Sequence, residues 1–468
     1  MAVLDQTVLL CVYGFFSNLR PSEPFLTAYL LGPDKNLTES QVVNEVYPVW
    51  TYSYLVLLFP IFLATDFLRY KPVLVLQATS LVVTYVMLLK VQGVLAMQLL
   101  EFFFGLATAS EVAYYSYIYS VVEPKHYQRV TGYCRSMALF GSAAGSLTGQ
   151  LLVSLAKAQL LHLVIITLTT AAVAFLAPWF LPMPKRSLFF HKSLEMEEKP
   201  RSTTALLEKA EDLETQLPLH SQAISTVSDR VLWPGHTVLQ VLLADFLKCY
   251  RCPSLLAWSL WWALATCGYF QVINYAQALW ENIRPSQDNE IYNGYVETLA
   301  TVFLTARPCW WAACLCAGLC GGELALCVLS LLMALCVFAM DTLRNIWLCY
   351  SSYVLFRAIY MLLITVATYQ IAASLNMQRY ALVFGVNTFL ALLLQSLLTV
   401  VVVDSAGLGL DVFTQFLIYG GYFVVISVVF LLAGLYKLAS RGALQAAAEA
   451  FSQSEDESQI KLLFYNVL

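Results

Sequence analysis

The sequence predicts an all-α integral membrane protein with twelve transmembrane helices in two six-helix halves. Of its 468 residues, 59% are hydrophobic and 12% are charged, whereas a soluble domain carries about 25% charged residues. Hydropathy separates twelve apolar stretches, each of roughly 20 residues, which is the length that crosses a bilayer. A polar segment at residues 184–238 divides these stretches into two sets of six.

The first six predicted spans are 7–31, 46–67, 72–89, 95–122, 129–153 and 159–182. The second six are 254–281, 292–318, 322–341, 346–372, 380–403 and 412–437. We therefore divide the chain into a first half (1–184), a cytosolic central loop (185–250), a second half (251–438) and a polar tail (439–468) that we expect to be disordered. Two sets of six spans joined by a long loop are the layout of the major facilitator fold. The N-terminus has no basic region or cleavage site of a secretory signal, so the first apolar stretch reads as a membrane span.

Lysine and arginine set the orientation, because they accumulate in cytosolic loops. With both termini in the cytosol, the outer loops hold only Lys35, Lys90, Lys157, Arg284 and Arg344. The same orientation places the single glycosylation sequon, Asn36-Leu37-Thr38, outside the cell. We therefore predict a multi-pass plasma-membrane protein with cytosolic termini, embedded in membrane lipids and glycosylated at Asn36.

Several functions are disfavoured. The net charge of −4 gives no reason to expect a nucleic-acid partner. The five histidines show no metal-ligand spacing, and Cys249-Tyr-Arg-Cys252 is a lone pair of cysteines, which is weak evidence for zinc or redox chemistry. Because the sequence also lacks a nucleophile elbow and a phosphate loop, we expect no metal, no cofactor and no enzymatic activity.

The fourth predicted span, 95–122, contains two carboxylates. Each would cost roughly 2.5–3.5 kcal/mol at mid-membrane, so such residues usually face a protein interior or a wet cavity. If the span is one helix, the following side chains share a face about 80° wide: Glu101, Phe104, Thr108, Glu111 and Tyr115. This polar and aromatic stripe predicts the wall of a solute pathway.

Spans 1, 4, 7 and 10 line the cavity of a facilitator fold, and all four carry intramembrane polar groups. Besides the two glutamates of span 4, these are Arg20, Glu23, Asn274, Gln277, Arg357 and Gln370. Span 2 adds Tyr47, Trp50, Thr51 and Tyr54 on one face, and Glu297 lies near the start of span 8. We expect some charges to pair, for example Arg20 with Glu111. The remaining acidic excess beside aromatic rings favours an organic cation, since each cation–π contact contributes about 0.5–2 kcal/mol.

Several longer motifs resemble one family. They include Arg20-Pro-Ser-Glu-Pro-Phe25, Tyr47-Pro-Val-Trp-Thr-Tyr-Ser-Tyr54 and Tyr380-Ala-Leu-Val-Phe-Gly-Val-Asn-Thr388. The chain resembles the folate/thiamine solute carriers, the reduced folate carrier family of the major facilitator superfamily, over nearly all of residues 7–437. Asp66-Phe-Leu-Arg69-Tyr-Lys71 also resembles the Asp-x-x-x-Arg-Lys signature of facilitator proteins, in which Asp66, Arg69 and Lys71 would form a cytosolic latch.

Within that family, charge favours the thiamine branch. The folate carriers have an arginine where this chain has Glu111 and a lysine where it has Gln395. The resemblance then implies import of thiamine (vitamin B1) by alternating access, with protons as a candidate coupling ion. It assigns the substrate contacts to Tyr47, Trp50, Glu101, Phe104 and Asn274, supported by Tyr85 and Glu297. Gating or supporting roles fall to Arg20, Glu23, Glu111, Gln277 and Arg357.

Two alternatives stay open at this point. One is an organic-anion exchanger of the folate type on the same fold. The other is a membrane receptor or scaffold that transports nothing, suggested by the polar central loop and tail.

One stretch departs from the family: Phe303–Gly322 carries Arg307-Pro308, a Trp pair and four of the twelve cysteines. A compensating pair of reading-frame shifts would produce such a patch, and we expect poor helix packing there.

Overall fold

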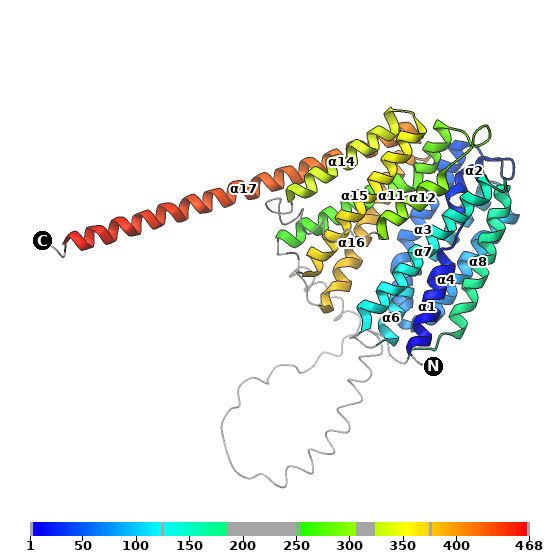
Figure 1. Cartoon of the computed structure of the whole chain (residues 1–468), viewed down its shortest axis with the longest axis horizontal. Coiled ribbons are helices and arrows are strands. Elements are labelled where there is room, and N and C mark those ends of the chain that lie inside the picture. The colour runs from blue at the N-terminus through cyan, green and yellow to red at the C-terminus, as the bar shows by residue number, and fades with distance from the viewer. Residues whose placement is uncertain are drawn as a thin grey trace, which may run out of the picture.

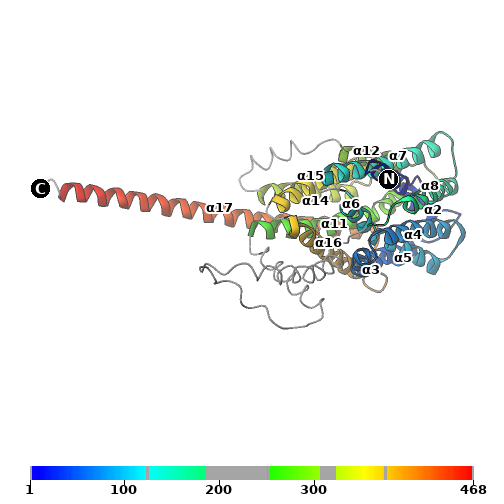
Figure 2. The same cartoon turned by 90° about the horizontal axis from the view of Figure 1, so that it is seen from below.

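The computed structural model describes residues 3–122, 126–184, 250, 253–305, 323–373 and 377–465. All regular structure within these ranges is helical, and the helices form two bundles that stand side by side (Figures 1 and 2). Nine helical stretches of the described chain are long and apolar enough to cross a membrane. The predicted central loop and most of the departing stretch, residues 306–322, lie outside the described residues, so neither prediction is tested.

The first bundle contains α1 (Val3–Asn18), α2 (Leu26–Leu31), α3 (Tyr47–Phe67), α4 (Lys71–Lys90), α5 (Val94–Ala109), α6 (Glu111–Val121), α7 (Tyr127–Ser154) and α8 (Leu160–Phe180). A short 3-10 helix, η1 (Glu23–Phe25), precedes α2, and a π-helical turn, η2 (Gln41–Val46), leads into α3. The second bundle contains α11 (Pro253–Ile283), α12 (Asn293–Thr305), α14 (Glu323–Thr342), α15 (Ile346–Ala373), α16 (Met377–Leu398), the π-helical η4 (Thr399–Val403) and α17 (Val412–Tyr465).

The same helix pairings occur in both bundles. In the first, α3 and α4 each pack on α5, α4 packs on α8, and α1 packs on α7. In the second, α12 and α14 each pack on α15, α14 packs on α17, and α11 packs on α16. The bundles meet along two seams, α7 with α12 and α3 with α16. Corresponding helices of the two halves therefore occupy corresponding places.

The first predicted span is interrupted in the structure. The helix stops after Asn18, and the chain re-forms helix only at η1 and α2. Pro21 lies in the interruption and Pro24 in η1, and neither has a backbone N–H to donate to a helical hydrogen bond. Irregular backbone at membrane depth is tolerated where protein covers it, and here α7 and α8 do so.

Glycines on α7 make the close approach of the broken span possible. A methyl group built on Gly145 would lie 2.6 Å from the backbone nitrogen of Arg20, and one on Gly141 would lie 2.3 Å from the carbonyl oxygen of Phe15. Both neighbouring atoms belong to the main chain and cannot rotate away. Small residues at helix contacts are a common way for membrane helices to approach closely.

The last helix corrects one prediction. The polar composition of the tail after residue 438 predicts disorder, but α17 continues as one helix to Tyr465 and projects away from the bundles (Figure 1). The run Ala443-Leu-Gln-Ala-Ala-Ala-Glu-Ala450 consists of strong helix formers, which polarity alone does not reveal.

At the N-terminal end of α17, the Thr414 hydroxyl donates to Asp411 at 2.6 Å. This hydrogen bond holds the pKa of Asp411 below its usual value.

Substitution of the contact glycine should separate packing from helix propensity. We expect Gly145→Ala to lower the melting temperature of the purified protein, because overpacking typically costs about 1–3 kcal/mol. The control is Gly132→Ala on the same helix, where an added methyl group meets nothing within 4 Å. Alanine should be neutral or stabilising there. Equal melting temperatures for the two variants would contradict the proposed contact.

Candidate functional site

The central feature of the site is the carboxylate of Glu101 on α5. Its side chain is buried at 5% exposure, and within the described residues it forms neither a hydrogen bond nor an ion pair. It interacts electrostatically with the phenols of Tyr47, Tyr85 and Tyr275. A buried carboxylate with no cation beside it is costly, so its surroundings suit a ligand that carries positive charge or hydrogen-bond donors.

Aromatic side chains from both bundles meet next to this carboxylate. The ring centroids of Tyr47 (α3) and Tyr275 (α11) are 6.2 Å apart, and those of Trp50 (α3) and Phe270 (α11) are 6.4 Å apart. Trp50 also donates its indole N–H to the Thr108 hydroxyl at 3.2 Å. The structure therefore places the predicted residues Tyr47 and Trp50 at the junction of the two halves.

Hydrogen bonds from the broken first span reach the same junction. The Thr27 hydroxyl lies 2.7 Å from the Tyr47 hydroxyl and 3.4 Å from Oε1 of Gln277, which also accepts the Thr27 backbone N–H. Gln277 in turn donates to the carbonyl oxygen of Glu23 at 2.9 Å. Asn274 is half-buried one turn earlier on α11. Of the predicted residues, Gln277 thus joins the two halves directly.

Arg20 follows the end of α1, and its partner differs from the expected one. Its Nη1 lies 3.7 Å from Oε1 of Glu23, not in an ion pair with Glu111. Its Nε donates to the Ser17 carbonyl at 2.7 Å, and its guanidinium carbon lies 5.6 Å from the centroid of Phe104. The break in the span turns Arg20 toward its own chain, whereas the prediction assumes a continuous helix.

The predicted stripe on span 4 is also divided. The helix is interrupted at Ser110, between α5 and α6, so Glu101 and Glu111 do not share one regular face. Glu101 is buried, whereas Glu111 is exposed and interacts electrostatically with Arg20 and Arg135. The two carboxylates therefore occupy different environments, and Glu101 is the one next to the aromatic junction.

A second buried charged group lies within the second bundle. Arg357 (α15) forms an ion pair with Glu297 (α12) through Nη1 and Oε2, and the Tyr353 hydroxyl donates to Oε1 of Glu297 at 2.6 Å. Nε of Arg357 is buried without a hydrogen-bond partner. The pairing neutralises Glu297, so its carboxylate is less suited to a cationic ligand than that of Glu101.

Three residues that contact the predicted site were missed from the sequence: Thr27, Phe270 and Tyr275. Thr27 belongs to the part of the first span that lies beyond the proline break. Phe270 and Tyr275 lie on the same helix as Asn274 and Gln277. The helical spacing of the aromatic and polar residues of span 7 is the sequence signal that indicates them.

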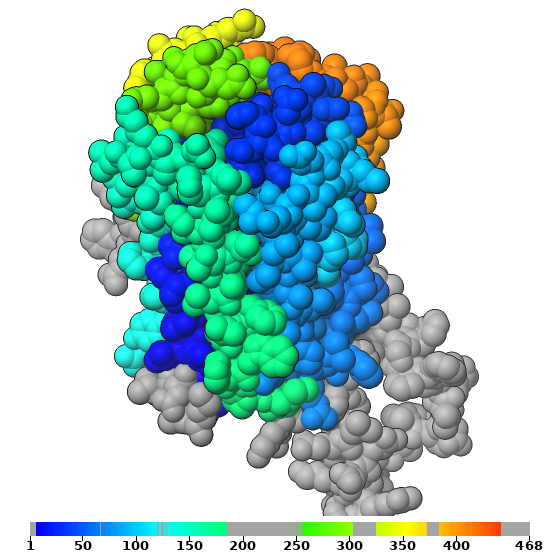
Figure 3. Space-filling view, turned by 90° about the vertical axis from the view of Figure 1, so that its right-hand side faces the viewer, coloured from blue at the N-terminus to red at the C-terminus, as the bar shows by residue number. Residues whose placement is uncertain are grey.

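The two bundles are joined at one end, which we call the outer end. It contains the α2–η2, α11–α12, α14–α15 and η4–α17 connections. Hydrogen bonds cross the junction there from Tyr52 to Asp404 at 2.7 Å, from Gln150 to the Ile291 carbonyl at 2.7 Å and from Asn293 to the Pro24 carbonyl at 3.1 Å. In the space-filling view, the dark-blue segment before α3 lies against the green and orange parts of the second half (Figure 3).

Every hydrogen bond between the bundles that is recorded for the described residues comes from the outer half of its helices or from an outer connection. They involve Glu23, Pro24, Thr27, Glu39, Asn44, Thr51, Tyr52, Ala143 and Gln150 of the first bundle. The conformation is therefore sealed on the outer side of the Glu101 site.

The predicted latch and glycosylation sites lie at opposite ends of the first bundle. Arg69 and Tyr70 adopt left-handed backbone angles between α3 and α4, and Nζ of Lys71 donates to the Trp179 carbonyl at the end of α8. The side chain of Asp66 lies outside the described part.

Asn36 is exposed in the outer connection between α2 and η2. Beside it, Lys35 donates to the Val91 carbonyl, and burial lowers the pKa of Lys35.

Comparison with solved structures identifies the fold. The POT family transporter PepTSo aligns with a TM-score of 0.64 at 12% identity, over 94% of this chain and 99% of that one. The nucleoside transporter NupG aligns with a TM-score of 0.57 at 14% identity, over 92% of this chain and 98% of that one. The chain has the major facilitator fold that these two proteins share.

The sequence profile of the reduced folate carrier matches residues 3–418, and the chain belongs to that family. Human thiamine transporter 1 is 56% identical over 92% of this chain and 89% of its own length. The human reduced folate transporter is 39% identical over 91% of this chain and 71% of its own length. The family and the all-helical facilitator fold expected from the sequence are both confirmed. Of the twelve expected spans, the described residues contain nine helical stretches long and apolar enough to cross a membrane.

The buried ion pair generates a prediction about stability. Arg357→Gln alone should destabilise the protein by about 3–5 kcal/mol, because it leaves the Glu297 carboxylate buried without its cation. Combining it with Glu297→Gln should recover much of that loss, since both charges are then absent. The measurement is the melting temperature of the purified protein for both single variants and the double variant. Strictly additive losses would show that the two side chains do not act as a pair.

Proposed function

We propose that the chain is a plasma-membrane transporter that imports thiamine by alternating access. The observation that carries the proposal is the buried Glu101 carboxylate, which lacks an ionic partner among the described residues and lies where aromatic side chains of both halves meet. Thiamine offers a fixed positive charge and an aminopyrimidine with hydrogen-bond donors. The high identity to a protein named thiamine transporter 1 supports the same substrate.

In this proposal each predicted contact has a separate task. Glu101 accepts hydrogen bonds from the aminopyrimidine edge, and Tyr47 and Trp50 hold the cationic ring by stacking and cation–π attraction. Phe104 completes the aromatic wall, although Arg20 also lies 5.6 Å from its ring. Asn274 supplies neutral hydrogen bonds from the second half. Tyr85 adds a buried phenol near Glu101, and Glu297 supports the site through its pair with Arg357.

Transport then requires the outer contacts to break. In the conformation described, hydrogen bonds of Gln277, Tyr52 and Gln150 join the halves above the site. Each such bond contributes about 0.5–1.5 kcal/mol net, so a modest difference in substrate affinity between the two conformations can shift the balance. Proton coupling stays a candidate, since Glu101 and Glu111 are intramembrane carboxylates.

The folate-type alternative fits the charges less well. A dianion needs cations that are available to it, but Arg20 lies next to Glu23 and Arg357 is paired with Glu297. Glu111 adds a negative charge near Arg20. The protein named reduced folate transporter is also less similar to this chain than the one named thiamine transporter 1.

Uptake by cells that express the chain tests the substrate and the site together. We expect saturable uptake of labelled thiamine and none of labelled folate. Glu101→Gln should raise the half-saturating concentration at least tenfold, because a hydrogen bond to a charged group is worth about 1.5–3 kcal/mol. Trp50→Ala should weaken uptake by a similar or smaller factor.

The matched controls are Asp288→Asn in an exposed outer connection and Trp179→Ala on an exposed face of α8. Both should transport as the wild type does. Folate uptake would instead establish the anion exchanger. Absence of uptake of both vitamins by a chain that reaches the cell surface would favour the receptor or scaffold.

Locking the outer end tests alternating access. Asn282 of α11 donates to Glu39 in the connection before η2, so the two positions face each other across the junction. In the variant Glu39→Cys/Asn282→Cys, oxidation should abolish thiamine uptake and a reductant should restore it. Each single cysteine variant should be insensitive to oxidation. Full uptake by the verified cross-linked protein would show that the outer end need not open.

The orientation predicts a glycan on Asn36. Treatment of the cell-expressed protein with an N-glycosidase should increase its electrophoretic mobility, and Asn36→Gln should give the faster form without treatment. Asn289→Gln, in another outer connection but outside any sequon, is the control. A wild-type chain that never shifts would contradict the placement of this connection outside the cell.

A further inference from the structure

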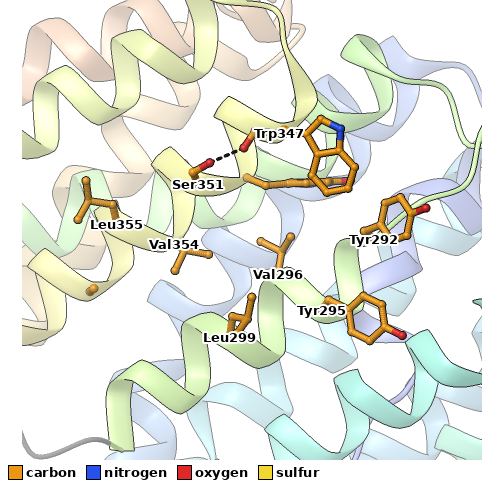
Figure 4. Close-up of a pocket in the computed structure, with 10 residues that line it drawn as sticks. Tyr292, Tyr295, Val296, Leu299, Trp347, Ser351, Val354 and Leu355 are labelled. Carbon is orange, nitrogen blue, oxygen red and sulfur yellow. Dashed lines mark hydrogen bonds between the residues drawn. The ribbon is translucent and has the colours of Figure 1, made fainter.

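A groove runs over an exposed surface of the second bundle, between α12 and α15 (Figure 4). It encloses about 660 Å³. Apolar side chains line its length, among them Val296, Leu299, Val354 and Leu355. Leu299 is 53% exposed and Leu355 is 48% exposed, so this face is not covered by another helix of the described chain.

Aromatic residues close the groove at its outer end. Tyr292 and Trp347 have ring centroids 5.3 Å apart, and Tyr295 stacks beside Tyr292 at 6.5 Å. Figure 4 shows these three rings at one end of the groove and the aliphatic side chains toward the other. Aromatic residues of this kind mark the headgroup level of a bilayer. The aliphatic part of the groove therefore lies at the depth of the acyl chains.

A smaller basic pocket of about 360 Å³ adjoins the aromatic end, and Trp347 lines both cavities. Its lining includes Arg284, Arg344 and Asn345. Neither arginine forms an ion pair within the described residues. Arg344 is exposed, and its guanidinium lies over the Phe413 ring, 4.6 Å from the ring centroid. Arginines held in this way can bind a phosphate group.

Negative charge is present on the other side of the aromatic rings. The Tyr292 hydroxyl donates to Glu290 at 2.9 Å, so a carboxylate lies at the rim of the groove. On the arginine side, Asp341 lies within electrostatic range of Arg344. The outer end of the groove thus presents two arginines on one side of Trp347 and an acidic, aromatic rim on the other. This pattern matches a zwitterion better than a simple anion, because aromatic faces and a carboxylate attract a quaternary ammonium.

We propose that this groove binds one phosphatidylcholine molecule from the leaflet at the outer end. Its phosphate contacts Arg284 and Arg344, its choline ammonium rests on Tyr292 and Trp347 beside Glu290, and one acyl chain lies between α12 and α15. The inward faces of these two helices carry Glu297 and Arg357, so the lipid packs behind the buried ion pair. The thiamine site is separate from this groove, and the proposal does not depend on it.

Photolabelling of the full-length protein tests the site. The chain is reconstituted in phosphatidylcholine nanodiscs with a trace of phosphatidylcholine that carries a diazirine on one acyl chain, and labelled peptides are identified by mass spectrometry. We expect labelling of residues 292–299 and 347–358 well above that of α8, which also faces lipid. Arg284→Gln/Arg344→Gln should reduce it roughly tenfold, the factor that corresponds to about 1.4 kcal/mol.

The charge-matched control is Lys90→Gln/Lys157→Gln, which removes two positive charges from the outer end of the first bundle and should leave labelling unchanged. Ser351→Trp fills the groove without altering the arginines and should also abolish the excess labelling. A phosphatidylglycerol with the same diazirine chain should label these peptides less. Equal labelling of α8, an unchanged signal in the arginine variant, or equal labelling by phosphatidylglycerol would each overturn the proposal.

Discussion

The organisation of this protein depends on the cost of placing charged groups inside a membrane. Each intramembrane charge has to be paired with an opposite charge, face water, or be neutralised by a bound ligand. Glu297 and Arg357 form an ion pair inside the second bundle, and Arg20 lies next to Glu23. Glu111 is exposed. Within the described residues Glu101 has no ionic partner and is not exposed, and this difference is why we propose it as the centre of the substrate site.

The close junction of the two halves follows from interruptions of regular helix. The first span breaks at Pro21 and Pro24, which allows η1 and α2 to lie over the site and Thr27 to reach both Tyr47 and Gln277. Glycines of α7 give the broken segment room. The seal at the outer end is therefore built from hydrogen bonds of backbone carbonyls and of amide, hydroxyl and carboxylate side chains, which can exchange their partners for water when the halves separate.

The charged groups are arranged differently in the two halves. The second bundle contains a neutralised pair that links α12 to α15, and its outer surface carries the proposed lipid groove. The first bundle contains the unpaired carboxylate and most of the aromatic wall. A substrate cation would thus bind mainly to the first half, and its contacts with α11 would couple binding to the second half. This asymmetry arises although the helix pairings of the two bundles correspond.

The sequence by itself determined the membrane class, the two-bundle fold and the family, because hydropathy depends on local composition. Intramembrane polarity predicted Tyr47, Trp50, Glu101 and Gln277 as residues of the site. Only the tertiary structure decided which charges pair. Arg20 meets Glu23 because the span breaks, and Glu297 meets Arg357 because α12 packs on α15. It also showed that the tail of α17 is helical and that Glu101 and Glu111 lie in different surroundings. Pairing and burial are set by distances between separate helices, and a single sequence carries no direct record of those distances.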